Sequence, residues 1–141
     1  MLWRLGKLKI ERRKLPAAAS FNMLNDVRSM LPKLTVHQMD NTYWSCLWAD
    51  WLKIIDNDWL NRKGYQADEF DCDDFAIAFK ARMSEKYGLN AVALIISYPP
   101  GHAYNIICPI DCLPIVFEPQ TDELVTLGEG IYGIDSGFIV L

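Results

Sequence analysis

Residues 70–76 read FDCDDFA, and this stretch predicts a helix that begins with a cysteine. Asp71 suits the N-cap position, and the two aspartates after the cysteine suit the first turn, where backbone N–H groups have no partner. Apolar residues then recur at three- and four-residue steps up to about Tyr87, as in a helix with one buried face. The helix dipole favours a thiolate at Cys72, although the neighbouring carboxylates oppose that effect. Cys72 is therefore a candidate nucleophile that needs a base from elsewhere in the chain.

The composition of the chain predicts one folded domain. Its 141 residues are 51% hydrophobic and 23% charged, which is enough apolar material for a core and an ordinary amount of charge. The net charge is −4, so no global excess of positive charge favours nucleic acid. Without an internal repeat or a low-complexity segment, residues 1–141 are interpreted as a single domain.

The four cysteines could form two disulfides, but the N-terminal sequence argues against an oxidising compartment. Basic residues are scattered through residues 1–19, and no unbroken apolar segment there resembles an export signal. The longest apolar run, residues 91–96, is far too short to cross a bilayer. We therefore expect a cytoplasmic protein with reduced thiols and no membrane partner.

Residues 1–19 are interpreted as a basic N-terminal arm or a peripheral strand, because a run of charge usually lies on a solvated face. The alternative is that the basic residues form an electrostatic handle for an acidic partner.

The next segments predict a short helix and a hairpin. Ser20 suits the N-cap of a helix over residues 21–31, which Pro32 ends. Residues 34–39 then predict a strand, and residues 43–47 predict the return strand of a hairpin after a polar turn.

Tryptophans are concentrated in one part of the chain. Trp44, Trp48 and Trp51 stand near helical spacing, which favours core packing because aromatic side chains bury a large area. The alternative is a wall on which sugars or bases stack. Trp59 falls just before a polar loop, so we expect it to be the most exposed of the group.

The second half of the chain predicts strands that bring a histidine near a carboxylate. If residues 102–108 and 114–120 pair across a turn near Asp111, then position 104 faces 118 and position 102 faces 120. Glu118 then becomes a diagonal neighbour of His102, and Gln120 lies directly opposite it. The other histidine, His37, falls on an early strand. Asn105 points to the opposite face of the sheet and is the weaker partner for the ring.

A cysteine hydrolase needs a thiol, an imidazole that takes its proton, and a third group that orients the ring. Cys72, His102 and Glu118 supply these three groups in the predicted arrangement. The oxyanion formed on attack needs hydrogen-bond donors, and the Cys72 N–H and the Gln66 side chain are candidates. Taken singly, each of these residues also has a purely structural explanation, as a packed helix cysteine, a turn histidine or a surface carboxylate.

Three short sequences carry a resemblance to a known family: FDCDDFA, then GHAYNI at residues 101–106, then FEPQT at residues 117–121. Together they resemble the papain-like domain related to the fairy-ring mushroom agglutinin, over about residues 65–125. The resemblance implies an α+β fold of the papain-like or transglutaminase-like kind, with N-terminal helices packed on an antiparallel sheet. It also implies a protease triad of Cys72, His102 and Glu118.

The same resemblance has implications for ligands. The chain has no counterpart of the β-trefoil lectin domain of the fungal proteins, so sugar binding is not implied. Stand-alone relatives occur in bacteria and their phages. Fungal members of the family depend on calcium or manganese, which makes Ca²⁺ or Mn²⁺ a possible cofactor here.

Local chemistry offers oxygen ligands for such a hard cation. The candidates are Asp73, Asp74, Gln120 and Asp122, with Glu118 beside them. The alternative is that the two aspartates serve the helix terminus and the other two residues lie in a turn. A zinc site at Cys108 and Cys112 is not expected, because no second Cys or His pair stands nearby to complete four ligands.

The sequence thus favours a cysteine hydrolase of amide bonds, peptide or isopeptide, acting on a protein or peptide substrate. Acyl transfer to an amine would use the same residues and stays open. The alternative is a non-catalytic binding or inhibitor protein on the same fold, for example one encoded by a phage and directed at a host protein. Its binding surface would then be the tryptophan-rich segment and the basic arm.

Overall fold

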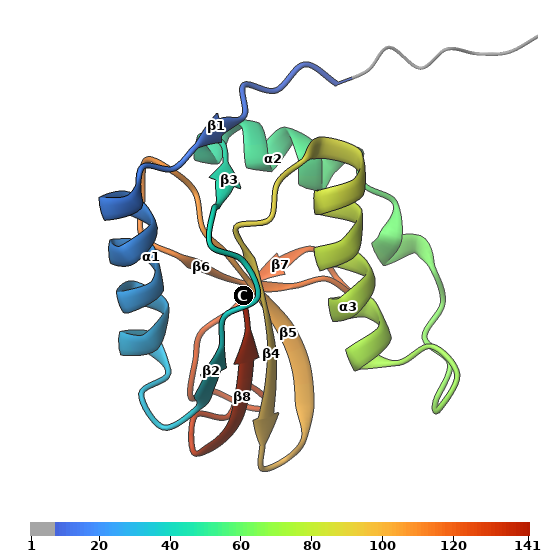
Figure 1. Cartoon of the computed structure of the whole chain (residues 1–141). Coiled ribbons are helices and arrows are strands. Elements are labelled where there is room, and N and C mark those ends of the chain that lie inside the picture. The colour runs from blue at the N-terminus through green and yellow to red at the C-terminus, as the bar shows by residue number, and fades with distance from the viewer. Residues whose placement is uncertain (1–7) are drawn as a thin grey trace, which may run out of the picture.

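The computed structural model describes residues 8–141, and within that range it holds three α-helices and a six-stranded sheet (Figure 1). The helices are α1 (Ala17–Met30), α2 (Trp48–Asn57) and α3 (Cys72–Arg82), with a 3₁₀ turn at Leu60–Arg62 and a π-helical turn at Met83–Tyr87. The strands are β1 (Arg13–Lys14), β2 (Thr35–His37), β3 (Trp44–Ser45), β4 (Val92–Tyr98), β5 (His102–Ile107), β6 (Ile115–Glu118), β7 (Glu123–Leu124) and β8 (Ser136–Val140). The predicted α+β class is confirmed.

The main sheet is mixed rather than antiparallel, which corrects the prediction. Its strand order is β2-β8-β4-β5-β6-β7. Strand β2 runs parallel to β8, whereas the other neighbouring strands pair in antiparallel fashion. Strands β1 and β3 form a separate two-stranded ribbon. The parallel pair was not predictable locally, because it joins segments about a hundred residues apart.

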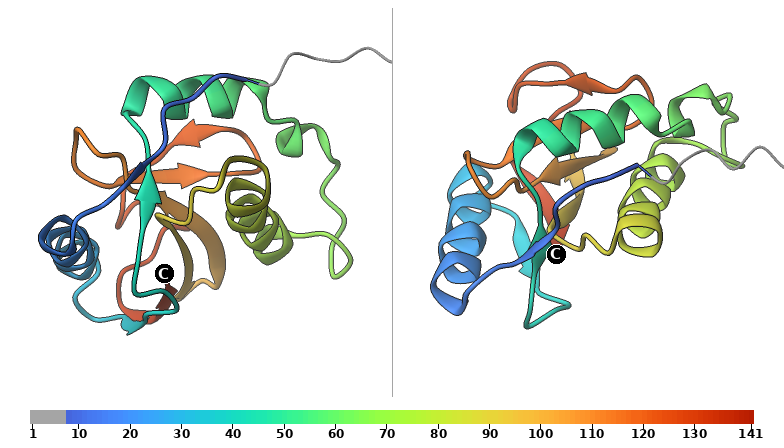
Figure 2. Two further views of the ribbon diagram at one scale, coloured as in Figure 1. Left: turned by 45° about the horizontal axis from the view of Figure 1, so that its top comes forward. Right: turned by 90° about the horizontal axis from the view of Figure 1, so that it is seen from above.

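Helices cover both faces of the main sheet, with α1 on one side and α3 on the other (Figure 2). On the α1 side, Val27 packs in one cluster with Ile95 and Ile106. On the other side, helices α2 and α3 pack in a second cluster with β4, β5 and β6, and the rings of Phe79 and Phe117 lie 4.7 Å apart. The central strands are therefore apolar on both faces, and each buried aromatic or aliphatic side chain contributes about 1.5–3 kcal/mol.

The predicted helix at the cysteine is confirmed, and its ends have identifiable causes. Asp71 occupies the N-cap and forms a capping box with Asp74, whose carboxylate accepts a hydrogen bond from the Asp71 N–H at 3.3 Å. After α3 and the π-helical turn, Gly88 adopts a left-handed conformation with φ 66°. Glycine suits that position because it has no Cβ to clash with the backbone.

Two predictions in the N-terminal half are wrong. Helix α1 begins at Ala17, after Pro16, and Ser20 lies inside the helix with its N–H bonded to the Pro16 carbonyl. The fixed φ of proline suits a helix start, so the helix gains one turn ahead of the predicted cap. The hairpin over residues 34–47 does not form, because β2 pairs with β8 and β3 pairs with β1.

The predicted peripheral strand of the N-terminal segment is present as β1, at residues 13–14. Residues 1–7 lie outside the described part of the chain. Next to β1, the Arg12 guanidinium stands 4.1 Å from the centre of the Trp44 ring. Within residues 8–141, no helix has both the length and the apolar character needed to cross a membrane.

Candidate functional site

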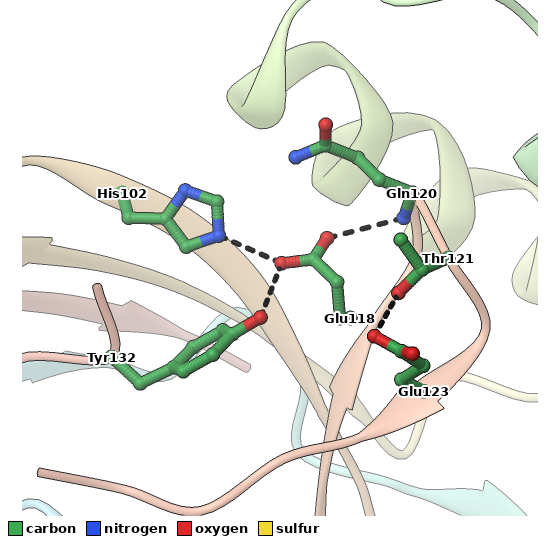
Figure 3. A network of polar contacts seen from close by, with 6 residues as sticks. All are labelled: His102, Glu118, Gln120, Thr121, Glu123 and Tyr132. Atoms are coloured by element: carbon green, nitrogen blue, oxygen red, sulfur yellow. Dashed lines mark hydrogen bonds and ion pairs between the residues drawn. The ribbon is translucent and has the colours of Figure 1, made fainter. Parts of the chain in front are cut away.

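A buried histidine–glutamate pair lies at one end of strands β5 and β6 (Figure 3). His102 Nε2 and Glu118 Oε2 are 2.7 Å apart, and the two residues are 7% and 4% exposed. The strand register is the predicted one, since Asn105 faces Phe117. The predicted diagonal contact between His102 and Glu118 is therefore confirmed.

Two further groups bind the Glu118 carboxylate. The Tyr132 hydroxyl donates to the same Oε2 at 3.0 Å, and the Gln120 backbone N–H donates to Oε1 at 3.1 Å. Tyr132 comes from the irregular segment between β7 and β8, which lies against the end of the sheet (Figure 3). Sequence reasoning missed this tyrosine, and the available signal was its place as the one tyrosine in a glycine-rich tail.

The hydrogen bonds set the protonation state of the carboxylate. Burial raises the pKa of Glu118, but hydrogen bonds from His102, the Gln120 N–H and Tyr132 outweigh burial, so its pKa lies below the usual value. Burial and the adjacent Glu118 charge both raise the pKa of Tyr132. The glutamate is therefore ionised and the tyrosine keeps its proton. Because an ionised carboxylate only accepts, His102 Nε2 carries the hydrogen of the shared bond.

Aromatic rings enclose the histidine. The His102 and Tyr104 rings stack with centres 6.1 Å apart, and the Tyr132 ring meets the imidazole edge-on at 5.4 Å. Burial raises the pKa of Tyr104 to about 12, so this ring also stays neutral. The imidazole is thus largely shielded from water, and its Nε2 makes the hydrogen bond to Glu118.

Cys72 lies near the first residues of β5. It begins α3 and packs with Ala76, Leu94 and Ala103. The Asn105 side chain donates to the Ala76 carbonyl at 3.0 Å, so the odd-numbered residues of β5 face α3. The His102 side chain alternates with that of Ala103, and its ring lies beside those of Tyr104 and Tyr132. Among residues 8–141, no hydrogen bond joins the thiol to the imidazole.

The predicted oxyanion donor Gln66 lies in the loop before α3. Its backbone forms an isolated bridge with Phe70, and its side chain is exposed. In the described part of the chain, neither Cys72 nor Gln66 forms a hydrogen bond with His102 or Glu118. The structure thus brings together two of the four predicted catalytic residues.

The predicted metal ligands separate into different places. Asp74 is engaged in the capping box. Asp73 instead groups with Asp71 and Cys72, with ligand atoms within 4.8 Å of one another. A hydrogen bond with the Asp71 carboxyl raises the pKa of Asp73, as does burial. Two carboxylates and a thiol are a poor donor set for Ca²⁺, which takes six to eight oxygen ligands.

The other two predicted ligands lie in the turn after β6. The backbone N–H of Gln120 is bonded to Glu118. Asp122 has a left-handed backbone with φ 59°. Burial, together with the Asp58 charge, raises the pKa of Asp122 to about 6. This turn is therefore shaped by backbone and burial effects, and it does not join the acidic group at the start of α3.

The loop between α2 and α3 exposes large aromatic rings. Trp59 and Tyr65 are each 59% exposed, as predicted for Trp59, whereas Trp51 is fully buried. The Arg62 guanidinium stands 4.6 Å from the centre of the Trp59 ring, and Lys63 Nζ stands 4.1 Å from the centre of the Phe70 ring. We name residues 58–71 the aromatic loop.

Comparison with known proteins gives a likeness of fold only. No protein-family model matches the chain, and no curated protein matches it. One similar solved structure is a PSL1a–E64 complex, with TM-score 0.64 and 21% identity. Another is the Polyporus squamosus lectin bound to the human-type influenza-binding epitope Neu5Aca2-6Galb1-4GlcNAc, with TM-score 0.62 and 18% identity. The likenesses cover 91% of this chain but 50% and 49% of those chains, so it spans about half their length.

The comparison corrects the prediction of a cysteine hydrolase. One matched structure is a lectin bound to a glycan, and likenesses at 21% and 18% identity show the fold alone, so they give the hydrolase prediction no support. The interpretation of the chain as a thiol protease is therefore set aside, and the α+β fold stands.

Proposed function

We propose that this chain is a non-catalytic binding protein whose aromatic loop holds a protein or peptide partner. The observation that carries the proposal is the exposure of Trp59 and Tyr65, each at 59%, within one short loop. Tryptophan and tyrosine are the residues that most often anchor interfaces, because they bury a large area at a small cost in side-chain entropy.

The aromatic loop is held in place at several points. At its start, the buried Asp58 carboxylate accepts a 2.9 Å hydrogen bond from Arg82 Nε on α3. Near its end, Phe70 packs edge-on against Phe75 with ring centres 4.7 Å apart. A loop that is already ordered loses little entropy on binding, so more of the contact energy is available for affinity.

Acidic residues lie in the same stretch of chain as the exposed rings. The loop carries Asp68 and Glu69, and Asp73 is exposed at the start of α3. The nearby cations Arg62 and Lys63 stand over aromatic faces. We propose that a partner contributes apolar side chains to Trp59 and Tyr65 and basic side chains to the carboxylates, with the exposed Gln66 amide as a further contact. No metal ion is part of this proposal.

A phage-displayed peptide library, selected on the purified chain, tests the proposal. We expect selected peptides to combine aromatic or aliphatic residues with Lys or Arg, and to bind the Trp59→Ala variant at least tenfold more weakly. Phe21→Ala is the matched control, because Phe21 is 61% exposed but lies on α1. The proposal would be overturned if the wild type cleaves labelled casein and the Cys72→Ala variant does not.

A glycan is the second candidate ligand, and the likeness to a glycan-bound lectin is the observation that favours it. The likeness covers half of that lectin, so it does not assign the glycan to the shared half. Calorimetry with Neu5Aca2-6Galb1-4GlcNAc tests this candidate. Heat of binding in the wild type that is lost in Tyr65→Ala would favour the glycan. Absence of any heat of binding in the wild type would leave the peptide proposal.

A further inference from the structure

A groove runs beside α1, far from the aromatic loop in the sequence and lined by other residues. Its main cavity has a volume of about 490 Å³ and lies between β1, α1 and residues 108–114. A second cavity of about 310 Å³ adjoins it, since Asp26 and Pro114 line both. We name this pair of cavities the α1 groove. Neither the His102–Glu118 pair nor the aromatic loop contributes to its lining.

Strand β1 borders the α1 groove and has a free edge. Lys14 faces Trp44 across the ribbon. The Trp44 N–H donates to the Asn90 side chain at 2.7 Å, and its carbonyl accepts from the Ala91 N–H at 3.3 Å. Trp44 therefore uses its backbone groups on the side away from β1, so the pair with Lys14 is a non-hydrogen-bonded one. The Lys14 N–H and carbonyl point away from β3 and have no partner within residues 8–141.

The walls of the groove combine an apolar floor with a charged rim. Leu15 and Met23 are buried beneath it, and Ile110 is half-buried. Arg13 and Lys14 are exposed at the β1 end. The ion pair of Arg13 with Glu11 is exposed on both sides, so it neutralises the cation only weakly.

One carboxylate opposes this positive end. Asp26 lies on α1 where the two cavities meet, and it is half-buried. The electrostatic character of the groove therefore changes along its length, from cationic at β1 to anionic at the junction. An acidic occupant is therefore attracted at the β1 end and repelled beside Asp26.

We propose that the α1 groove binds an extended acidic peptide segment of a partner protein, which adds to the free edge of β1 as a further strand. In such strand addition, main-chain hydrogen bonds supply affinity and alternate side chains supply specificity. The Lys14 N–H and carbonyl bond the peptide backbone. Acidic side chains of the peptide lie beside Arg13 and Lys14, and the apolar side chains alternating with them lie on Met23 and Ile110. The inference rests on the proposed binding function but assigns a separate surface.

A fluorescein-labelled peptide of alternating Glu and Val residues is the probe, and fluorescence anisotropy is the measurement. A peptide of alternating Lys and Val is the matched control, because it has the same strand propensity and the opposite charge. We expect the Glu peptide to bind at least tenfold more tightly at low salt. That difference shrinks as salt screens the charges.

Three changes test the geometry of the bound strand. Lys14→Pro removes the outward N–H and is expected to weaken binding about tenfold, whereas Lys14→Arg retains binding. If Lys14→Pro does not fold, the Glu peptide with N-methylated backbone amides tests the same hydrogen bonds on the wild type. Asp26→Asn removes the opposing carboxylate and is expected to tighten binding about threefold.

Thiol labelling locates the probe independently. Cys112 is exposed and lines the groove, whereas Cys72 lies at the start of α3. We expect the Glu peptide to slow alkylation of Cys112 severalfold and to leave Cys72 unchanged.

Equal binding of the Glu and Lys peptides, or unchanged alkylation of Cys112 at saturating peptide, would overturn the inference. The proposed function is then judged separately, because peptides selected on the aromatic loop lose affinity through Trp59→Ala rather than through Lys14→Pro. If only the effect of Trp59→Ala on the selected peptides is missing, the proposed function is contradicted. If only the effect of Lys14→Pro on the Glu peptide is missing, strand addition at the α1 groove is contradicted.

Discussion

The two regions that the sequence placed in a single site differ in how the fold uses them. The His102–Glu118–Tyr132 network is buried, and its carboxylate accepts three hydrogen bonds. Cys72 is half-buried at the start of α3 and packs against Ala76, Leu94 and Ala103. The difference teaches that residues in the right order along the chain can form a hydrogen-bonded network without including the thiol, since no hydrogen bond joins Cys72 to it in the described part of the chain. We infer that the network mainly stabilises the end of the sheet.

The largest expected effect compares truncations in the two regions. Glu118→Ala leaves His102, Tyr132 and the Gln120 N–H without their buried acceptor, so it should lower the free energy of unfolding by about 3 kcal/mol. Cys72→Ala removes a half-buried sulfur and should cost less than about 1 kcal/mol. Urea unfolding measures both. Equal costs for the two variants would contradict the contrast.

Acid sharpens the same comparison. Because the folded-state pKa of Glu118 is lowered, its stabilisation is present above the unfolded value of about 4.3 and is lost as pH falls through the folded value. The stability gap between wild type and Glu118→Gln should therefore shrink by more than half between pH 7 and pH 2. Urea midpoints across that range provide the test, and a gap that stays constant would show that the carboxylate charge is not the cause.

A smaller effect is expected for the tyrosine that sequence reasoning missed. Tyr132→Phe deletes one donor to Glu118 and keeps the ring, so it should destabilise the fold by about 1 kcal/mol. Tyr98→Phe is the control, because Tyr98 is 50% exposed, and it should have almost no effect. If the two variants unfold at the same urea concentration, the Tyr132 bond contributes nothing measurable.

The smallest effect concerns Asp122, in the turn after β6. Its folded-state pKa is raised to about 6, so ionisation costs stability as pH rises from about 4 to 6. Asp122→Asn removes that cost and tolerates the left-handed backbone, and after discounting for solvent screening the gain at pH 7 is at most about 1 kcal/mol. Thermal unfolding at pH 7 and pH 3.5 measures it. A gain of the same size at both values would exclude the charge as its origin.

Local patterns predicted a large part of the fold. The capped helix at Cys72, the strands at 102–107 and 115–118, and the register between β5 and β6 all follow from periodicity and turn residues. Those signals act over a few residues or across one short turn. The same reasoning failed for β2 and β3, because their partners β8 and β1 are not the neighbours that a hairpin would supply.

By itself, the sequence determined which residues form the capped helix and that His102 shares a face with Glu118 and Gln120, because side chains alternate along two strands joined by one turn. Only the tertiary structure decided that α3 packs on β4 and β5 and that Tyr132 completes the network. It also decided that α1, β1 and residues 108–114 enclose a groove. The physical reason is that helix placement and long-range strand pairing depend on burial of the whole core, to which no short segment is sensitive.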